Sequence, residues 1–143
     1  MRNTKFIAIF LFSIILLTGC ESKELSCTKE ETADSGKVNE KQVFIFKNNT
    51  ISTYDAEMVI NLNDDFKDYA DLLLESLESP FEEFKDKKGI TYKTSKNDNK
   101  ISVSISADYD KIDEDTKKSL GIFENPSFEK TKKTLEDDGY KCK

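Results

Sequence analysis

Apolar and polar residues alternate along much of the chain, the pattern of strands with one face buried and one face wet. The clearest case is Lys100–Ala107, where three serines alternate with Ile101, Val103, Ile105 and Ala107. Residues 90–95 precede it, and Lys96-Asn97-Asp98-Asn99 supplies turn-forming residues between the two. This region therefore predicts a β-hairpin.

A second hairpin is predicted earlier in the chain. Gln42–Lys47 is rich in Val, Ile and Phe, and Asn48-Asn49 follows as a tight-turn pair, because asparagine tolerates left-handed backbone geometry. Thr50–Leu62 continues as a long, largely alternating strand in which we expect a bulge near Asp55-Ala56. The polar stretch before residue 42 predicts only a short strand at Leu25–Lys29.

Helical spacing replaces alternation between Asp64 and Lys87, where apolar residues form one stripe. The stripe consists of Phe66, Tyr69, Ala70, Leu73, Leu74 and Leu77. Ser79-Pro80, with Glu82 closing a capping box, can start a new helix, so this segment is one kinked helix or two short ones. Such a stripe is usually core, although an exposed stripe would be a partner-binding face. Phe81 and Phe84 are expected to face the core.

The C-terminal third predicts two further helical segments. Asp108–Leu120 is acidic, and Asn125-Pro126 can start a helix that runs to Asp138, with Phe128 and Leu135 inward and Gly139 as its stop. Tyr140–Lys143 is expected to return as a short strand. The predicted fold class is α+β: an antiparallel sheet built from two hairpins and packed against two to three helices.

Cys27 and Cys142 lie near the two ends of this predicted domain. In an exported protein such a pair favours a disulfide, which would join the termini and stabilise the fold by roughly 4 to 5 kcal/mol on chain-entropy arguments. The alternative is a reactive thiol, whose pKa the neighbouring Lys29, Lys141 and Lys143 would lower.

The first nineteen residues have the pattern of an export signal. A cationic start with Arg2 and Lys5 is followed by the apolar run Phe6–Leu17. Twelve residues cover about 18 Å as a helix, too short for a hydrocarbon core of about 30 Å. A signal peptide therefore fits better than a membrane-spanning helix.

Leu17-Thr18-Gly19-Cys20 follows that run and resembles the lipobox of bacterial lipoproteins. The resemblance implies cleavage before Cys20 and acylation of its thiol, with palmitate or a similar chain. Two acyl chains are enough for stable anchoring at the extracytoplasmic face of the cell membrane. An ordinary secretory peptide cleaved after Gly19 is the alternative. Whether an inner or an outer membrane is the destination stays open.

These segments give a domain organisation of signal peptide 1–19, short tether 20–26 and one α+β domain 27–143. The leader holds two of the 22 basic residues and none of the 28 acidic ones, so the chain from Cys20 carries a net charge of −8. An acidic surface disfavours nucleic acid as a partner. It would suit a cationic protein or peptide, although such charge also simply keeps a small domain soluble.

The order of elements after the lipobox resembles the YehR-like family of small bacterial lipoproteins, a family of unknown function with an α+β fold. The similarity covers most of residues 42–143, with the Phe44-to-Ile51 hairpin and the Leu135-to-Lys141 ending as its best local matches. The resemblance implies the fold and the anchor. It brings no catalytic residues and no cofactor.

Candidate catalytic and metal-binding residues are few. The chain has no histidine, which excludes Ser-His-Asp and Cys-His mechanisms as they are usually built. The best cation candidate is an acidic group that begins like an EF-hand loop but lacks its glycine and its terminal glutamate. This group is Asp108, Asp110, Asp113 and Asp115. We interpret these residues as a solvated edge and a helix start, with no metal.

Three functional hypotheses remain. The first is a non-enzymatic binding module of the cell envelope, in a sharper form an inhibitor of a cationic lytic enzyme. The second is a structural or stress-related envelope protein without a specific ligand. The third is an enzyme that uses carboxylates alone, which requires a cleft with two converging acids. The absence of a catalytic constellation favours the first.

Overall fold

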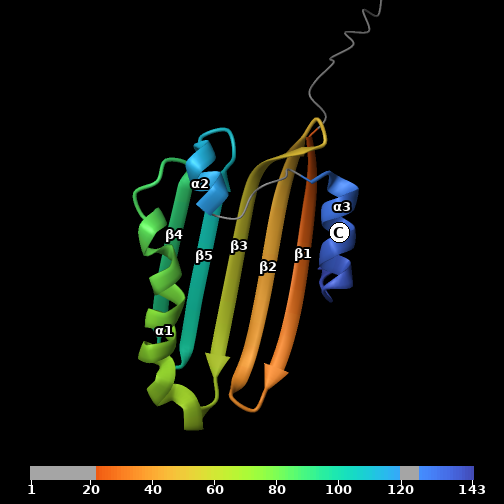
Figure 1. The fold of residues 1–143 in the computed structure, drawn as a ribbon. Coiled ribbons are helices and arrows are strands. Elements are labelled where there is room, and N and C mark those ends of the chain that lie inside the picture. Colours follow the sequence, from red (N-terminus) through yellow and green to blue (C-terminus); the bar gives the residue numbers. More distant parts are fainter. Residues whose placement is uncertain (1–21, 120–125) are drawn as a thin grey trace, which may run out of the picture.

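The computed structural model describes residues 22–119 and 126–143, which form one antiparallel sheet with helices on one face (Figure 1). In chain order the elements are β1 (Ser22–Ala33), β2 (Gly36–Lys47), β3 (Thr50–Leu62), η1 (Asp64–Tyr69), α1 (Ala70–Glu78), η2 (Ser79–Phe84), β4 (Ile90–Asn97), β5 (Lys100–Asp108), α2 (Glu114–Ser119), α3 (Phe128–Asp137) and β6 (Lys141–Cys142). The predicted leader, the lipobox residues Leu17 to Cys20, and Leu120 and Asn125 lie outside the described residues.

The strand order is β4-β5-β3-β2-β1-β6, and every neighbouring pair is antiparallel. The predicted α+β class and both predicted hairpins are confirmed, and pairing of β3 with β5 joins the hairpins into one sheet. The turns between β2 and β3 and between β4 and β5 are tight. Asn48, Asn49 and Asp98 all have positive φ there, as residues of two-residue hairpin turns often do.

The N-terminal part of the sheet is longer than predicted. β1 spans twelve residues and includes Ser22–Ser26, a segment assigned to the tether by sequence, and β2 begins at Gly36 instead of Gln42. Only Leu25 and Cys27 of β1 are buried. Because most of this strand has polar side chains on both faces, it lacks the alternation that identifies a half-buried strand.

The irregularity in β3 lies at a different place from the one predicted. Asp55 and Ala56 keep regular partners in β2, so the prediction of a bulge there is wrong. Instead, the register shifts where Ile45 pairs with Thr53 and Phe46 pairs with Ile51, leaving Ser52 as the extra residue. A bulge beside the turn buries both Ile51 and Ser52.

The helical segment after β3 is continuous and changes its pitch from 3₁₀ to α and back. The predicted capping box is wrong. Ser79 has helical geometry, with φ −50° and ψ −46°, and lies inside the helical run, so it does not cap the start of a new helix. The predicted apolar stripe is core over most of its length. Ala70 is buried, and Leu73, Leu74 and Leu77 pack around it, whereas Phe66 and Tyr69 remain exposed.

The C-terminal elements return to the sheet as predicted. α3 begins at Phe128, two residues after Pro126, because the Ser127 side chain caps it by accepting a hydrogen bond from the Lys130 backbone N–H. Gly139, with φ +89°, ends the helix. β6 then pairs with β1 at Cys27 and Thr28, and Cys27 and Cys142 form a disulfide.

The buried side chains form three groups on the helix-covered face. One lies between β1, β2 and α3 around Phe46, and one lies under α1 around Ile101. The third lies around Phe84, where η2 and the loop after β5 meet Ile90, the first residue of β4. All three groups and the disulfide fall within residues 22–143, so this part of the chain contains the complete described fold.

Candidate functional site: the open face of the sheet

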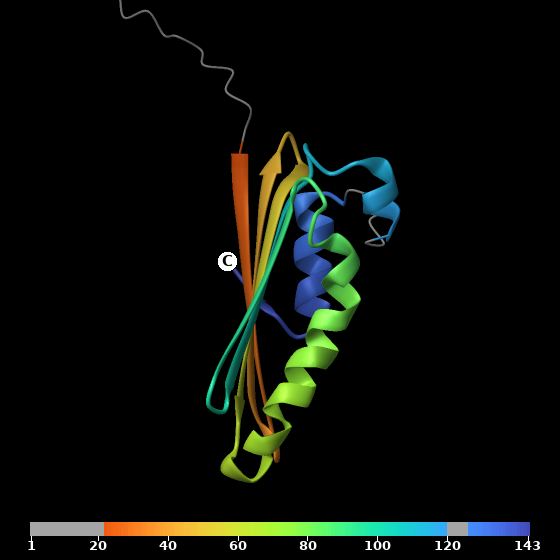
Figure 2. The same ribbon diagram turned by 90° about the vertical axis from the view of Figure 1, so that its left-hand side faces the viewer.

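The face of the sheet opposite the helices is uncovered (Figure 2). The strand registers assign to this face a row of hydroxyl side chains along β5, three half-buried aliphatic residues and charges of both signs. Its lysines are Lys37, Lys41, Lys47, Lys93, Lys100 and Lys141, and its carboxylates are Glu24, Glu30, Asp55, Glu57 and Asp108. The negative charge of the chain is therefore not concentrated here.

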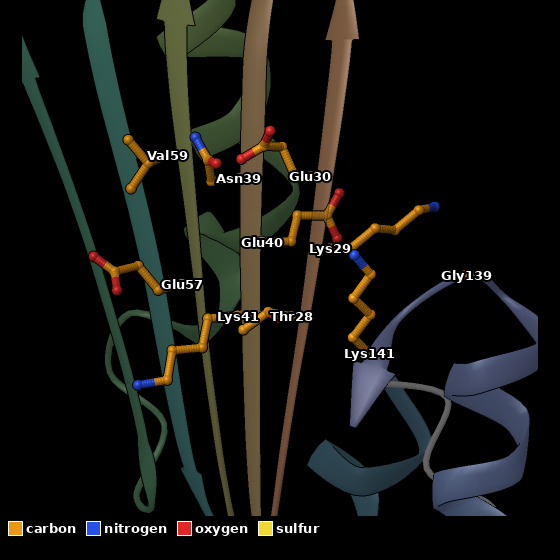
Figure 3. Close-up of a pocket in the computed structure, with 10 residues that line it drawn as sticks. All are labelled: Thr28, Lys29, Glu30, Asn39, Glu40, Lys41, Glu57, Val59, Gly139 and Lys141. Atoms are coloured by element: carbon orange, nitrogen blue, oxygen red, sulfur yellow. The ribbon is translucent and has the colours of Figure 1, made fainter. Parts of the chain in front are cut away.

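A hollow of about 580 Å³ lies on this face towards the β6 edge (Figure 3). Cross-strand pairing places Lys141, Thr28, Lys41 and Glu57 in one row across its floor. Glu30, Asn39 and Val59 form the next row. Neighbouring strands lie about 4.8 Å apart, so the row from Lys141 to Glu57 spans roughly 14 Å of sheet.

Only some of the charges at this hollow have a partner. Glu30 pairs with Lys37 at 2.7 Å, and Lys29 pairs with Glu31 at 2.7 Å. The Glu31 carboxylate raises the pKa of Lys29 through this contact. Within the described part of the chain, no ion pair engages Lys41, Lys141 or Glu57. Two cations and one anion are thus available to a ligand in one row.

Two further hollows continue along the open face. One, of about 280 Å³, lies over β3, β5 and β4 and is lined by hydroxyls of Ser104 and Ser106 and by Lys93. Another, of about 420 Å³, lies at the Gly89 end of β4 and includes Asp55 and Asp108. The open face therefore offers a series of shallow depressions to a ligand that extends across the strands.

The acidic group proposed as a cation candidate is spread over a loop and a helix start. Asp108 pairs with Lys111 at 2.6 Å, and this hydrogen bond lowers the pKa of its carboxyl group. The Asp113 carboxylate accepts a hydrogen bond from the Thr116 backbone N–H at 2.7 Å, which lowers its pKa too. Asp110 and Asp115 are exposed. In residues 22–119 and 126–143, no three carboxylates or thiols converge as metal ligands do.

Of the other predicted site residues, the structure joins Cys27 to Cys142 and so excludes a reactive thiol at either position in the oxidised state. Leu17, Thr18, Gly19 and Cys20 lie outside the described residues. Among the helices in the described ranges, none has the length and apolar character needed to cross a membrane.

Burial raises the pKa of several tyrosines behind the sheet. The largest effect is at Tyr54, whose pKa rises to about 12, first through burial and then through nearby Tyr109, Tyr140 and Glu40. Its hydroxyl donates to the Gln42 side-chain oxygen at 3.3 Å. Tyr54 therefore stays neutral in the folded protein at a pH where an unfolded chain would ionise it.

This shift predicts a loss of stability at alkaline pH. The contribution of Tyr54 to the free energy of unfolding is complete below about pH 10. It is lost progressively towards about pH 12, because the unfolded chain releases the Tyr54 proton first. By about pH 11 the Tyr54 contribution should fall by roughly 1 kcal/mol. Urea unfolding between about pH 8 and 11 measures it, with Tyr54→Phe as the comparison. Equal pH dependence in both proteins would contradict the assignment.

Sequence reasoning did not identify the open face as a surface. The sequence does show the residues of this face as the polar positions of each alternating strand, for example Ser102, Ser104 and Ser106 in β5. Alternation shows that such residues share a face, but not which residues of other strands lie beside them.

No protein-family model matches the chain, and no curated protein matches its sequence. Two solved structures are similar. The NMR structure of a protein from Streptococcus pneumoniae TIGR4 has a TM-score of 0.58 and 16% identity, covering 100% of this chain and 98% of that one. The NMR structure of the E. coli YehR protein has a TM-score of 0.62 and 14% identity, covering 85% of this chain and 91% of that one. At these identities the likeness concerns the fold alone, and the chain shares its α+β fold with E. coli YehR and the S. pneumoniae protein.

Proposed function

We propose that the chain is a lipid-anchored module of a bacterial cell envelope, held to the extracytoplasmic face by acylated Cys20, and that it binds a polar ligand across the open face of its sheet. The observation that carries the binding role is the row of Lys141, Thr28, Lys41 and Glu57, with three of its charges unpaired within the described residues. A ligand with groups of both signs would complement this row.

The short chain between Cys20 and the sheet agrees with a role at the membrane surface. The first residue of β1 is Ser22, two positions after Cys20. Two residues span at most about 7 Å, so an acylated Cys20 would hold the sheet close to the lipid surface. The ligand would then be a component of the envelope or a molecule that reaches its surface.

Two carboxyl groups, at the end of β5 and in the acidic loop after it, lack the raised pKa of a general acid. A general acid of a carboxylate enzyme needs a raised pKa. Hydrogen bonds to the ionised form lower the pKa values of the Asp108 and Asp113 carboxyl groups. These two residues are thus suited to ion pairing and helix capping.

The anchor is tested with Cys20→Ala. We expect a labelled palmitate analogue to mark the wild-type protein in growing bacteria, and the variant to lose the label and retain its leader. The Cys27→Ala/Cys142→Ala variant is the matched control, because it removes the other two cysteines and should keep the label. Label on the Cys20→Ala variant would rule out this anchor.

The binding surface is tested by affinity capture with oxidised residues 21–143. We expect Lys41→Ala/Glu57→Ala to reduce capture of an envelope component at least tenfold, since both side chains lie in the hollow. Lys133→Ala/Asp137→Ala removes one lysine and one carboxylate from α3 and should leave capture unchanged.

Each outcome of the capture experiment decides between the functional hypotheses. Equal loss with both variants would mean that the ligand does not use the open face. Release of a single basic protein by salt would favour the inhibitor of a cationic lytic enzyme. No captured component, with the domain folded, would favour the structural role.

A further inference from the structure

A separate hollow lies behind the sheet, on the face that carries the helices. Figure 1 shows α1 in front of β4 and β5 and α3 beside β1, with no helix drawn across the lower part of β2 and β3 between them. The hollow in this region has a volume of about 260 Å³. It lies between the buried group under α1 and the group under α3, so the core does not close over the centre of the sheet.

Most of its wall is apolar. Met58, Val103 and Ile105 form the floor on the sheet, and Leu77, Phe81 and Tyr92 form the side. The rings of Phe81 and Tyr92 are stacked with centroids 4.6 Å apart and an interplanar angle of 16°. The Tyr92 hydroxyl donates to the Leu77 carbonyl at 2.8 Å, which fixes this wall. A flat apolar group fits such a space, although the volume is smaller than that of a drug-sized pocket.

The opposite wall is polar and rich in hydrogen-bond acceptors. Glu40 and Gln42 lie one above the other on β2, and both line the hollow. The Tyr140 hydroxyl donates to one oxygen of Glu40, and the Tyr54 hydroxyl donates to Gln42. A carboxylate accepts several hydrogen bonds, so Glu40 keeps acceptor capacity beyond the bond from Tyr140.

The charges near the hollow favour a cation. Burial raises the pKa of Tyr92, and the nearby carboxylates of Glu78 and Glu82 add to this effect, although Glu82 is also paired with Lys85. Lys41 and Glu57 also contribute to the lining, but the strand register places both side chains on the open face. Lys29, on the neighbouring strand, is paired with Glu31 and lies over the Tyr140 ring.

We propose that this hollow is a binding site for a small amphipathic cation, a molecule with one flat apolar group and one amine. The apolar group lies against Met58 and the Phe81–Tyr92 pair, and the ammonium group donates to Glu40. The site differs from the open-face hollow in its apolar wall, although Glu40, Lys41 and Glu57 contribute to the lining of both.

Phenethylamine and 3-phenylpropionate provide a matched pair of probes, because each has a phenyl ring on a two-carbon arm but the charges are opposite. Both are titrated to about 10 mM into ¹⁵N-labelled residues 21–143, a range that detects affinities near 1 mM. We expect saturable amide shifts at Gln42, Met58 and Tyr92 with phenethylamine, and at least tenfold weaker binding of 3-phenylpropionate. Equal binding of both probes, or shifts confined to other residues, would overturn the proposal.

Two variants test the site further. Glu40→Gln keeps an acceptor for Tyr140 and should weaken phenethylamine about tenfold, whereas Glu30→Gln, on the open face, should leave its affinity unchanged. Ala56→Leu places a larger side chain in the hollow and should abolish binding while the amide spectrum remains that of a folded protein. Unchanged affinity in both Glu40→Gln and Ala56→Leu would also reject the proposal, whatever the result at the open face.

Discussion

Replacing both Cys27 and Cys142 with alanine should lower the free energy of unfolding by about 2 to 5 kcal/mol. The bond joins the first strand to the penultimate residue and closes a loop over a sequence separation of 115 residues. Breaking such a long loop increases the entropy of the unfolded chain by an amount equivalent to roughly 4 to 5 kcal/mol.

The folded state also depends on this bond at the edge of the sheet. β6 has two residues and pairs with β1 only at Cys27 and Thr28, with two more backbone hydrogen bonds between Ser26 and Lys143. These few backbone hydrogen bonds are not enough to keep the C-terminal residues from fraying. Without the disulfide, β6 should separate from β1, while α3 keeps its contacts through Phe128 and Leu135.

Urea unfolding of the wild type, the double variant and the chemically reduced wild type measures this effect. The variant and the reduced protein should agree and should both show a steeper dependence on urea, because an unlinked unfolded chain exposes more surface. A change of less than about 1 kcal/mol in both would contradict the stabilising role of the disulfide.

Leu25→Ala should destabilise the protein by about 2 to 5 kcal/mol. Leu25 is 0% exposed and belongs to the buried group around Phe46, between β1, β2 and α3. Alanine would remove three carbon atoms from a packed interior and leave a cavity, since hydrogen bonds hold β1 to β2 and the strands do not close over it. The effect is a large share of the 5 to 15 kcal/mol typical of a domain.

Leu72→Ala is the matched control, because it makes the same chemical change at a position that is 65% exposed. Alanine suits the interior of α1, so this variant should stay within about 0.5 kcal/mol of the wild type. Thermal and urea unfolding of the two variants measure the difference. A comparable loss in Leu72→Ala would mean that the exposed side of α1 is covered in the folded protein.

The periodicity of the sequence determined the two hairpins, the main helix and the C-terminal return. These predictions succeeded where one face of an element is apolar and the other polar, as in β5 with Ile101 buried and the serines opposite. They failed where this contrast is weak. β1 extends far beyond the predicted Leu25–Lys29. Most of its residues are polar on both faces, so no alternation marked its full length in the sequence.

Local motifs were less reliable than periodicity. Ser79 and Glu82 satisfy the sequence pattern of a capping box, yet the helix continues through Ser79 because Phe81 and Phe84 pack onto the sheet in the same helical run. The bulge of β3 likewise lies at Ser52, where the chain turns after Asn49, and not at Asp55. In both cases packing of the neighbouring elements outweighed a local preference of a fraction of a kcal/mol to about 2 kcal/mol.

The sequence by itself determined which residues are apolar together and which turns are tight, and it favoured a disulfide between Cys27 and Cys142 over a reactive thiol. Only the tertiary structure decided that β3 pairs with β5, that the helices cover one face, and that Lys141, Lys41 and Glu57 lie in one row across four strands. The reason is physical. Periodicity records the environment of each residue along its own element, whereas the neighbours across a sheet are set by the register of strands far apart in the chain.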